Sequence, residues 1–316
     1  MSGLYRRVIT IKATDSPNVK LGLAQVAAGQ VPTNKVIVPG VLPYQEYVNR
    51  RRMWDRVAQT IGLDAQFYEG AEVLLFPPEW LNRAERIADK LAGRVRQART
   101  IGIDPAEGGD HTAMAVVDAY GLIELVAYKT PDTSVIPQQT IAMMRKHNVP
   151  ADRVFFDRGG GGKEHADRLR ALGYPVHTVA FGAVGEAELR RGGLVPLADR
   201  LSQREQRYAY RNRRAEMYWI LHDLLDPNSE TVVQQGWRGF ALPRKYVKLR
   251  HQLAPIPLLR DQEGRLYLPP KHKPGPNSQV ACLTDLIGHS PDEADALCLA
   301  CFGLVRRARE VIAGVL

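Results

Sequence analysis

The feature that most constrains the fold is a short strand that ends on an aspartate and is followed by two more strands. Residues 99–104, Arg-Thr-Ile-Gly-Ile-Asp, alternate isoleucine with small or polar residues, which is the period of a β-strand. The run breaks at Pro105 and the glycines after it, and two apolar runs follow at 113–117 and 122–128. We predict three antiparallel strands, with Asp104 at the end of the first.

A second series of elements follows these strands. Residues 137–147 have the apolar spacing of a helix, and residues 153–157 form a short apolar strand that again ends on an aspartate, Asp157. A helix at 164–172 and a strand at 176–181 continue the alternation. This pattern predicts an α/β fold in which a mixed sheet, an antiparallel three-strand meander plus parallel strands, is flanked by helices.

The glycine-rich loop at 158–162 does not match a nucleotide-binding loop. A P-loop has the pattern G-x-x-x-x-G-K-[ST]. If Lys163 is taken as its lysine, Asp157 replaces the first glycine and Glu164 replaces the final Ser or Thr. We therefore expect no bound nucleotide and no ATPase activity, and we expect these glycines to let the backbone pass close to a metal ion or a DNA strand.

The last predicted helix carries a pair of carboxylates at its start. Ser290 is the expected N-cap, Pro291 occupies the first helical position, and Glu293 completes a capping box. Asp292 and Asp295 are three residues apart, so both lie on one face of the first turns. A favourable charge at a helix N-terminus would account for Asp292 alone. Asp295 is the stronger candidate for a ligand, because small residues flank it on an apolar helix.

Composition narrows the class of partner. The chain has 316 residues and a formal net charge of +9, which favours a polyanionic partner, nucleic acid before a membrane. No apolar run approaches the ~20 residues of a membrane span, and the first residues do not form a signal peptide.

The three cysteines fit a reducing compartment. Cys298 and Cys301 have a zinc-like spacing but lie in an apolar helical run, so we expect buried core cysteines.

Four aspartates form a candidate cluster: Asp104 and Asp157 at strand ends, and Asp292 and Asp295 on the helix. Hard oxygen ligands suit Mg²⁺ or Mn²⁺ rather than zinc. Two such ions, about 3.5–4 Å apart, can activate water and stabilise the leaving oxygen in phosphodiester hydrolysis. Small neighbours such as Gly102 are expected to leave room for metal ions and backbone phosphates.

Basic side chains elsewhere are expected to hold the phosphates of DNA. The segment 186–214 is rich in arginine interleaved with tyrosine, and 244–251 adds more positive charge. The predicted DNA contacts are Arg158, Lys163, Arg211, Arg213, Arg214, Lys245 and Lys248.

Four segments taken together resemble the nuclease domain of phage terminase large subunits. They are residues 102–112, 154–162, 211–219 and 290–297, and they occur in the order found in that family. The resemblance covers about residues 97–307. It implies an RNase H/RuvC-like fold and an endodeoxyribonuclease that uses two metal ions to cut concatemeric viral DNA during packaging.

The resemblance also implies roles for the aspartates. Asp104 corresponds to the first acidic ligand and Asp157 to the second, while Asp295, together with Asp292, takes the position on the helix. It implies double-stranded DNA as the substrate, other terminase subunits and the portal protein as partners, and the host cytoplasm as the place of action.

The first part of the chain resembles only the closing part of a packaging ATPase domain, on the evidence of residues 10–18 and 76–80. We predict a small N-terminal α/β region at 1–96 and a nuclease domain at 97–316. Two alternatives stay open: a nuclease similar to Holliday-junction resolvases, and a non-catalytic DNA-binding or docking subunit of a packaging motor.

Overall fold

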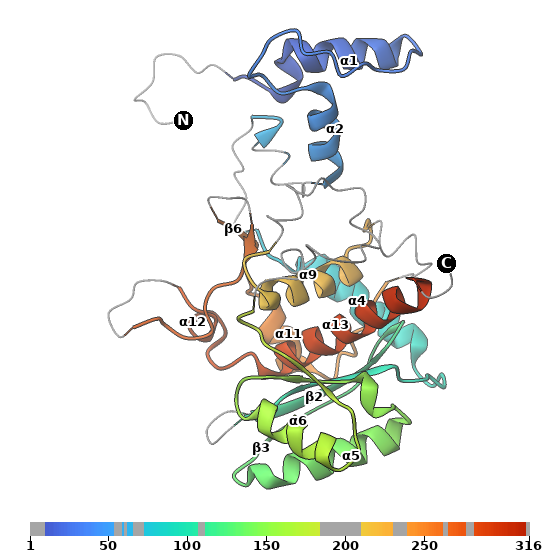
Figure 1. Ribbon diagram of the computed structural model, residues 1–316, viewed down its shortest axis with the longest axis vertical. Coiled ribbons are helices and arrows are strands. Elements are labelled where there is room, and N and C mark those ends of the chain that lie inside the picture. The colour runs from blue at the N-terminus through green and yellow to red at the C-terminus, as the bar shows by residue number, and fades with distance from the viewer. Residues whose placement is uncertain are drawn as a thin grey trace. The chain divides into compact units, whose positions relative to one another are not determined.

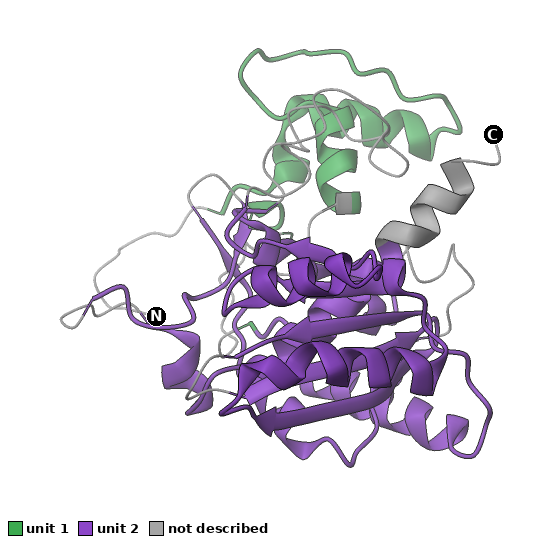
Figure 2. Ribbon diagram, turned by 60° about the horizontal axis from the view of Figure 1, so that its bottom comes forward, with its two compact units in different colours: residues 1–73 green, residues 74–316 purple. Residues whose placement is uncertain are grey.

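The computed structural model describes most of the chain (Figure 1). The described residues are 10–53, 59, 62–65, 73–106, 111–183, 210–229, 239–261, 265–275 and 281–313. They fall into two compact units, residues 1–73 and 74–316 (Figure 2). The smaller unit contains a 3-10 turn at Ala13–Asp15 and helices α1, Pro17–Ala27, and α2, Tyr44–Met53.

A buried asparagine organises the smaller unit. The side-chain amide of Asn18, on α1, donates hydrogen bonds to the carbonyl oxygens of Val38 (3.0 Å) and Val41 (3.1 Å). Its Oδ1 accepts from the backbone nitrogens of Ile37 (2.6 Å) and Val38 (2.9 Å). One side chain therefore fixes the loop that leads from α1 to α2.

The larger unit is built on a mixed five-stranded sheet with the order β3-β2-β1-β4-β5. Strands β1, β2 and β3 form an antiparallel meander, and β4 and β5 run parallel to β1. The strands are β1 Thr100–Asp104, β2 His111–Asp118, β3 Gly121–Lys129, β4 Val154–Asp157 and β5 His177–Val179. The predicted α/β fold with its mixed sheet is confirmed.

Helices cover both faces of this sheet. On one face α5, Ile136–His147, and α6, Gly162–Ala171, pack over a core that includes Ile101 and Ile103 of β1. On the other face lies α13, Asp292–Ala313, with α9 packed against it (Figure 1). Because side chains alternate along a strand, Thr100 and Gly102 face α13 while the two isoleucines face α5 and α6.

The remaining elements complete the face that carries α13. They are α4 Pro78–Leu91, α9 Arg213–Leu225, α11 Val247–Leu253, the hairpin of β6 Leu259–Arg260 with β7 Leu266–Tyr267, and α12 Leu283–Ile287. Leu75, Phe76 and Leu81 belong to the same core as α13, so the residues just after 73 pack with the larger unit. The assignment of residues 1–96 to an ATPase-derived region stays a prediction.

Helix α13 lies directly on the central strand. A Cβ atom at Gly102 would clash with the carbonyl oxygen of Ala296 and the backbone nitrogen of Ala300. Next to it, the Thr100 hydroxyl donates a 2.9 Å hydrogen bond to the Ala300 carbonyl oxygen. The expectation that Gly102 leaves room for metal ions is wrong, because the backbone of α13 fills that space.

The three cysteines are free and buried, as predicted, and Cys298 and Cys301 lie in the core on α13. In the parts of the chain that the structure describes, we find no helix with the length and apolar character needed to cross a bilayer.

Candidate active site

Two aspartates lie at the same edge of the sheet because neighbouring parallel strands end there. Strands β1 and β4 pair in a register that places Ile103 opposite Phe156. One residue further along, Asp104 and Asp157 close the two strands. Asp104 is 5% exposed, and Asp157 is half-buried.

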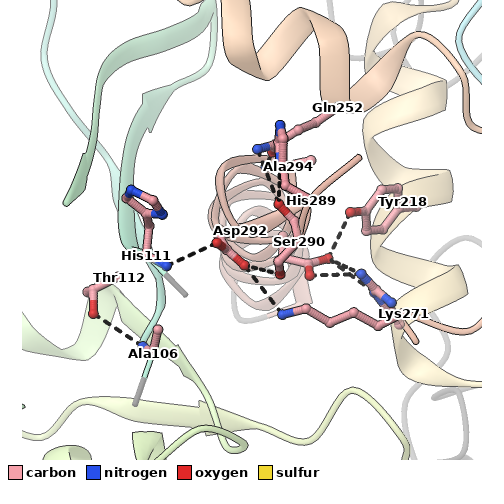
Figure 3. Close-up of polar contacts among 12 residues, drawn as sticks. Ala106, His111, Thr112, Tyr218, Gln252, Lys271, His289, Ser290, Asp292 and Ala294 are labelled. Atoms are coloured by element: carbon pink, nitrogen blue, oxygen red, sulfur yellow. Dashed lines mark hydrogen bonds and ion pairs between the residues drawn. The ribbon is translucent and has the colours of Figure 1, made fainter. Parts of the chain in front are cut away.

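The start of α13 supplies two more carboxylates at this edge. Asp292 and Asp295 occupy its first turn, and both are buried. Asp292 Oδ2 accepts a 3.2 Å hydrogen bond from the backbone nitrogen of His111, which begins β2 (Figure 3). The negative charges of Asp157, Asp292 and Asp295 all act on Asp104. The structure therefore brings the four predicted carboxylates into one cluster, called here the aspartate cluster.

A lysine from a distant connector enters the aspartate cluster. Lys271 Nζ lies 3.4 Å from Asp292 Oδ1, and the Ser290 hydroxyl donates to the same oxygen (Figure 3). The lysine lies in a proline-rich stretch after β7, and nothing in its local sequence distinguishes it from the other basic residues of the chain. Sequence reasoning missed it for that reason.

Asp295 has a more extensive set of partners. Arg214, on α9, donates to Asp295 Oδ1 from Nε (3.1 Å) and Nη2 (2.9 Å), and to Oδ2 from Nη2 (2.8 Å). The Tyr218 hydroxyl donates a 2.7 Å hydrogen bond to Oδ1. Both partners are buried. Asp295 is thus held in a buried, charge-paired network.

Burial and mutual repulsion alter the acidity of the strand-end aspartates. Burial, reinforced by the charges of Asp295, Asp157 and Asp292, raises the pKa of Asp104 well above its ordinary value, while Lys271 opposes the rise. Burial also raises the pKa of Asp157 to about 6, although the backbone amide of Gly159 donates to its charged form and lowers it. Both groups would be stabilised in their charged forms by a cation.

Asp104 and Asp157 are the residues that would hold a divalent metal ion. The carboxylate of Asp104 is buried, and no described residue donates a hydrogen bond to it. Mg²⁺ is commonly held by one or two carboxylates with water and substrate phosphate. Within the described ranges, no three His, Cys, Asp or Glu side chains converge to hold a metal. Arg214 and Lys271 contact Asp295 and Asp292 instead.

Known structures share this fold. Two forms of the nuclease domain of the large terminase subunit gp2 of the bacterial virus Sf6, and a form of gp2c of the large terminase subunit of the same virus, match this chain with a TM-score of 0.53 and 18–19% identity. The match covers 72% of this chain and 98–99% of theirs. This chain has the fold of a terminase nuclease domain. Of the three, one is described with manganese and beta-thujaplicinol and another with calcium.

The resemblance predicted from the four sequence segments is therefore confirmed at the level of the terminase nuclease fold. No protein-family model matches the sequence, and no curated protein matches it either.

Two of the seven residues that we predicted to contact DNA are buried inside the protein. Arg213 is buried and donates to Glu216 at 3.0 Å, and Arg214 is buried against Asp295. These contacts place both guanidinium groups against carboxylates inside the protein rather than at the surface.

The other five predicted contacts are exposed or half-buried. Lys163 pairs with Asp167 at 2.8 Å, and Lys248 lies 3.5 Å from Glu293. The cationic groups of Arg211 and Lys245 lie over the rings of Tyr267 (5.7 Å) and Tyr246 (4.9 Å). Arg158, directly after Asp157, is exposed. These five remain predictions.

The start of α13 has a cap that sequence reasoning missed. Gln252, fully buried on α11, accepts a 2.8 Å hydrogen bond from the backbone nitrogen of Ala294 and donates at 3.5 Å to the Ser290 carbonyl oxygen. The predicted capping box differs from this arrangement, since the Ser290 hydroxyl donates to Asp292 and Glu293 pairs with Lys248. Gln252 therefore fixes the helix turn that carries the two aspartates.

Proposed function

We propose that this chain is a metal-dependent DNA endonuclease of a viral genome-packaging terminase. The observation that carries the proposal is the aspartate cluster at one edge of a terminase-like sheet, with Asp104 buried and given no hydrogen bond by any described residue. The Sf6 domain that has the same fold is described with manganese, which supports Mn²⁺ or Mg²⁺ as the cofactor.

We propose that different carboxylates of the aspartate cluster would hold different metal ions. Asp104 and Asp157 would hold the first ion, and Asp292 and Asp295 would contribute to a second. An ion bound there would stabilise the leaving oxygen and lower the pKa of the attacking water. The protein contributes geometry: paired strands fix the first two carboxylates, and α13 with its Gln252 cap fixes the other two.

Binding of DNA would rest on its phosphates. Exposed Arg158, Lys163, Arg211 and Lys245 in the larger unit suit contacts with the phosphate backbone, which carry no base sequence. We therefore propose double-stranded DNA as the substrate, with little sequence preference. Other terminase subunits and the portal protein are the proposed partners, and the host cytoplasm is the proposed site of action.

A plasmid-nicking assay tests the activity. We expect the protein to convert supercoiled plasmid to nicked and linear forms with Mn²⁺ or Mg²⁺, and to stop when EDTA is added. Asp104→Asn is the matched control, and it should bind DNA but not cut it. Binding without any cutting by the wild type would favour the non-catalytic docking subunit, and cutting restricted to four-way junctions would favour a resolvase.

The proposal also predicts no ATP hydrolysis by this chain. The glycine loop at 159–162 lies between β4 and α6, as in a P-loop protein, yet its sequence lacks the first glycine and the Ser or Thr of that motif. DNA-stimulated ATPase activity that disappears in Lys163→Ala would contradict this expectation.

A further inference from the structure

The turn that follows Asp104 is held by a buried threonine. Pro105 has no backbone N–H, so the nitrogen of Ala106 is the first backbone donor after the end of β1. It donates a 3.2 Å hydrogen bond to the Thr112 hydroxyl on β2 (Figure 3). Thr112 is fully buried, and its hydroxyl also accepts a 2.9 Å hydrogen bond from the hydroxyl of Thr130. A hydroxyl has two acceptor positions, and Thr112 uses both to tie the turn to the neighbouring strands.

The other side of the same turn packs against the glycine loop that follows Asp157. Gly160 has a φ of +55°, and a Cβ atom there would lie 2.6 Å from the carbonyl oxygen of Pro105. A Cβ atom at Gly162 would lie 2.9 Å from the Pro105 ring and would clash with the carbonyl oxygen of Asp157. Pro105 itself is buried. These two glycines therefore leave the space that Pro105 occupies.

These contacts connect the two strand-end carboxylates through their backbones. Asp104 is the last residue of β1, so its position depends on the turn after it as well as on strand pairing. Asp157 in turn directly precedes the glycine loop. The sequence led us to expect that these glycines let the backbone pass close to a metal ion or a DNA strand. At Gly160 the close neighbour is the Pro105 carbonyl oxygen instead.

We infer that Thr112 and Gly160 are positioning residues, which hold Pro105 from two sides and so fix Asp104 relative to Asp157. This inference rests on the proposed function. Displacement of Asp104 would slow the chemical step, because catalysis depends on the exact placement of the reacting groups. It would leave DNA binding intact, because binding of the phosphate backbone rests on basic side chains.

The first test removes the Thr112 hydroxyl. We expect Thr112→Val to lower the nicking rate at saturating DNA and Mn²⁺ by about 10–100-fold, with the Kd for DNA unchanged. Thr112→Ser keeps the hydroxyl and should restore most of the wild-type rate. Thr140→Val is the matched control. Thr140 is also fully buried, but its hydroxyl donates to the Ile136 carbonyl oxygen of its own helix, so the nicking rate should not change.

The second test fills the space beside Pro105. Gly160→Ala adds a methyl group 2.6 Å from the Pro105 carbonyl oxygen, and it should also lower the rate at saturating DNA without changing the Kd. Gly173→Ala is the matched control, because Gly173 also has a positive φ, +87°, but nothing lies within 4 Å of its added Cβ. Both variants strain the backbone, and only Gly160→Ala displaces the turn.

Hydrogen exchange adds a measurement that does not depend on activity. The Ala106 amide proton should exchange about two- to tenfold faster in Thr112→Val than in the wild type, because the hydrogen bond that protects it is lost. Thr112→Ser and Thr140→Val should leave its exchange rate unchanged.

Three results would overturn the inference while leaving the proposed function intact, provided that the wild type nicks plasmid. They are a wild-type rate in folded Thr112→Val, a Thr112→Ser variant no more active than Thr112→Val, or weaker DNA binding by Gly160→Ala at an unchanged saturated rate, which would place DNA against the glycine loop. If Thr112→Val does not fold by circular dichroism, the comparison of Gly160→Ala with Gly173→Ala still decides. A wild type that does not nick plasmid with either metal ion would overturn the proposed function itself.

Discussion

Gly102 of β1 and Ala296 of α13 meet backbone to backbone, with no space between them for a side chain. Asp104 lies two residues along the strand from this contact, and Asp295 directly precedes Ala296 on the helix. The contact therefore sets how closely the helix carboxylates approach the strand carboxylates. A glycine in the centre of the sheet thus controls the geometry of the aspartate cluster.

Gly102→Ala should destabilise the protein and reduce DNA cleavage. The added methyl group would meet backbone atoms of Ala296 and Ala300, which cannot move aside as the end of a flexible side chain can. Overpacking of this kind typically costs about 1–3 kcal/mol. Denaturant unfolding and plasmid nicking measure the two effects. Gly182→Ala is the control, because nothing lies within 4 Å of its added Cβ. Equal stability and activity of the two variants would contradict the role given to Gly102.

Asp104→Asn should abolish cleavage and raise the melting temperature of the metal-free protein. The buried carboxylate of Asp104 lies among three others and receives no hydrogen bond from the described residues, so removing its charge relieves repulsion. For a unit of this size, each kcal/mol gained raises the melting temperature by about 2–4 °C. Melting curves in EDTA measure the shift, and a lower melting temperature than that of the wild type would contradict the argument.

Asp295→Asn should have the opposite effect on stability, although it should also abolish cleavage. Asp295 is paired with buried Arg214, and removing one partner of such a pair typically costs about 3–5 kcal/mol. Because asparagine keeps one acceptor oxygen, we expect a loss at the low end of that range. The two Asp→Asn variants can be melted side by side in EDTA. If both variants shift the melting temperature in the same direction, the ion pair with Arg214 does not determine how Asp295 affects stability.

The stability gained by Asp157→Asn should depend on pH. The folded-state pKa of Asp157 is about 6, above the ordinary value near 3.8, so the folded protein binds more protons than the unfolded chain between these values. Ionised Asp157 therefore costs stability that grows as the pH rises through this window. The free energy of unfolding of Asp157→Asn minus that of the wild type should be near zero below about pH 4 and should rise to a plateau above about pH 6.

That difference is to be measured without metal, since a bound cation would favour the ionised form. Taking the difference between Asp157→Asn and the wild type removes the contributions of carboxylates that do not interact with Asp157; those of Asp104 and Asp295, which do interact with it, remain in the difference. A difference that stays constant from acid to neutral pH would show that Asp157 titrates like an exposed aspartate.

The sequence was sufficient to predict the elements that carry the carboxylates. Alternation in β1 and the short apolar run of β4 each end on an aspartate, and the pattern at 290–295 predicts a helix start with two acidic residues on one face. These features are local, because strand and helix periods are visible within a few residues. They are also the reason that the fold could be predicted.

The partners of those carboxylates could not be predicted from the sequence. Arg214 is 81 residues from Asp295, Lys271 is 21 residues from Asp292, and Gln252 is 42 residues from Ala294. Each contact depends on how α9, a connector or α11 packs against α13, and no local pattern records that packing. Arg214 was instead predicted to contact DNA. It lies in an arginine-rich segment, and the sequence does not indicate which of these arginines is buried.

The hydrogen bond between Thr100 and Ala300 joins residues 200 positions apart, and it bears on the order in which the protein is made. As the chain leaves the ribosome, the strands that end on Asp104 and Asp157 emerge long before the helix that carries Asp292 and Asp295. Until that helix arrives, one face of the central strand lacks its cover and the four carboxylates cannot meet. A partly synthesised chain can therefore expose its basic side chains to nearby DNA while the aspartate cluster is still incomplete.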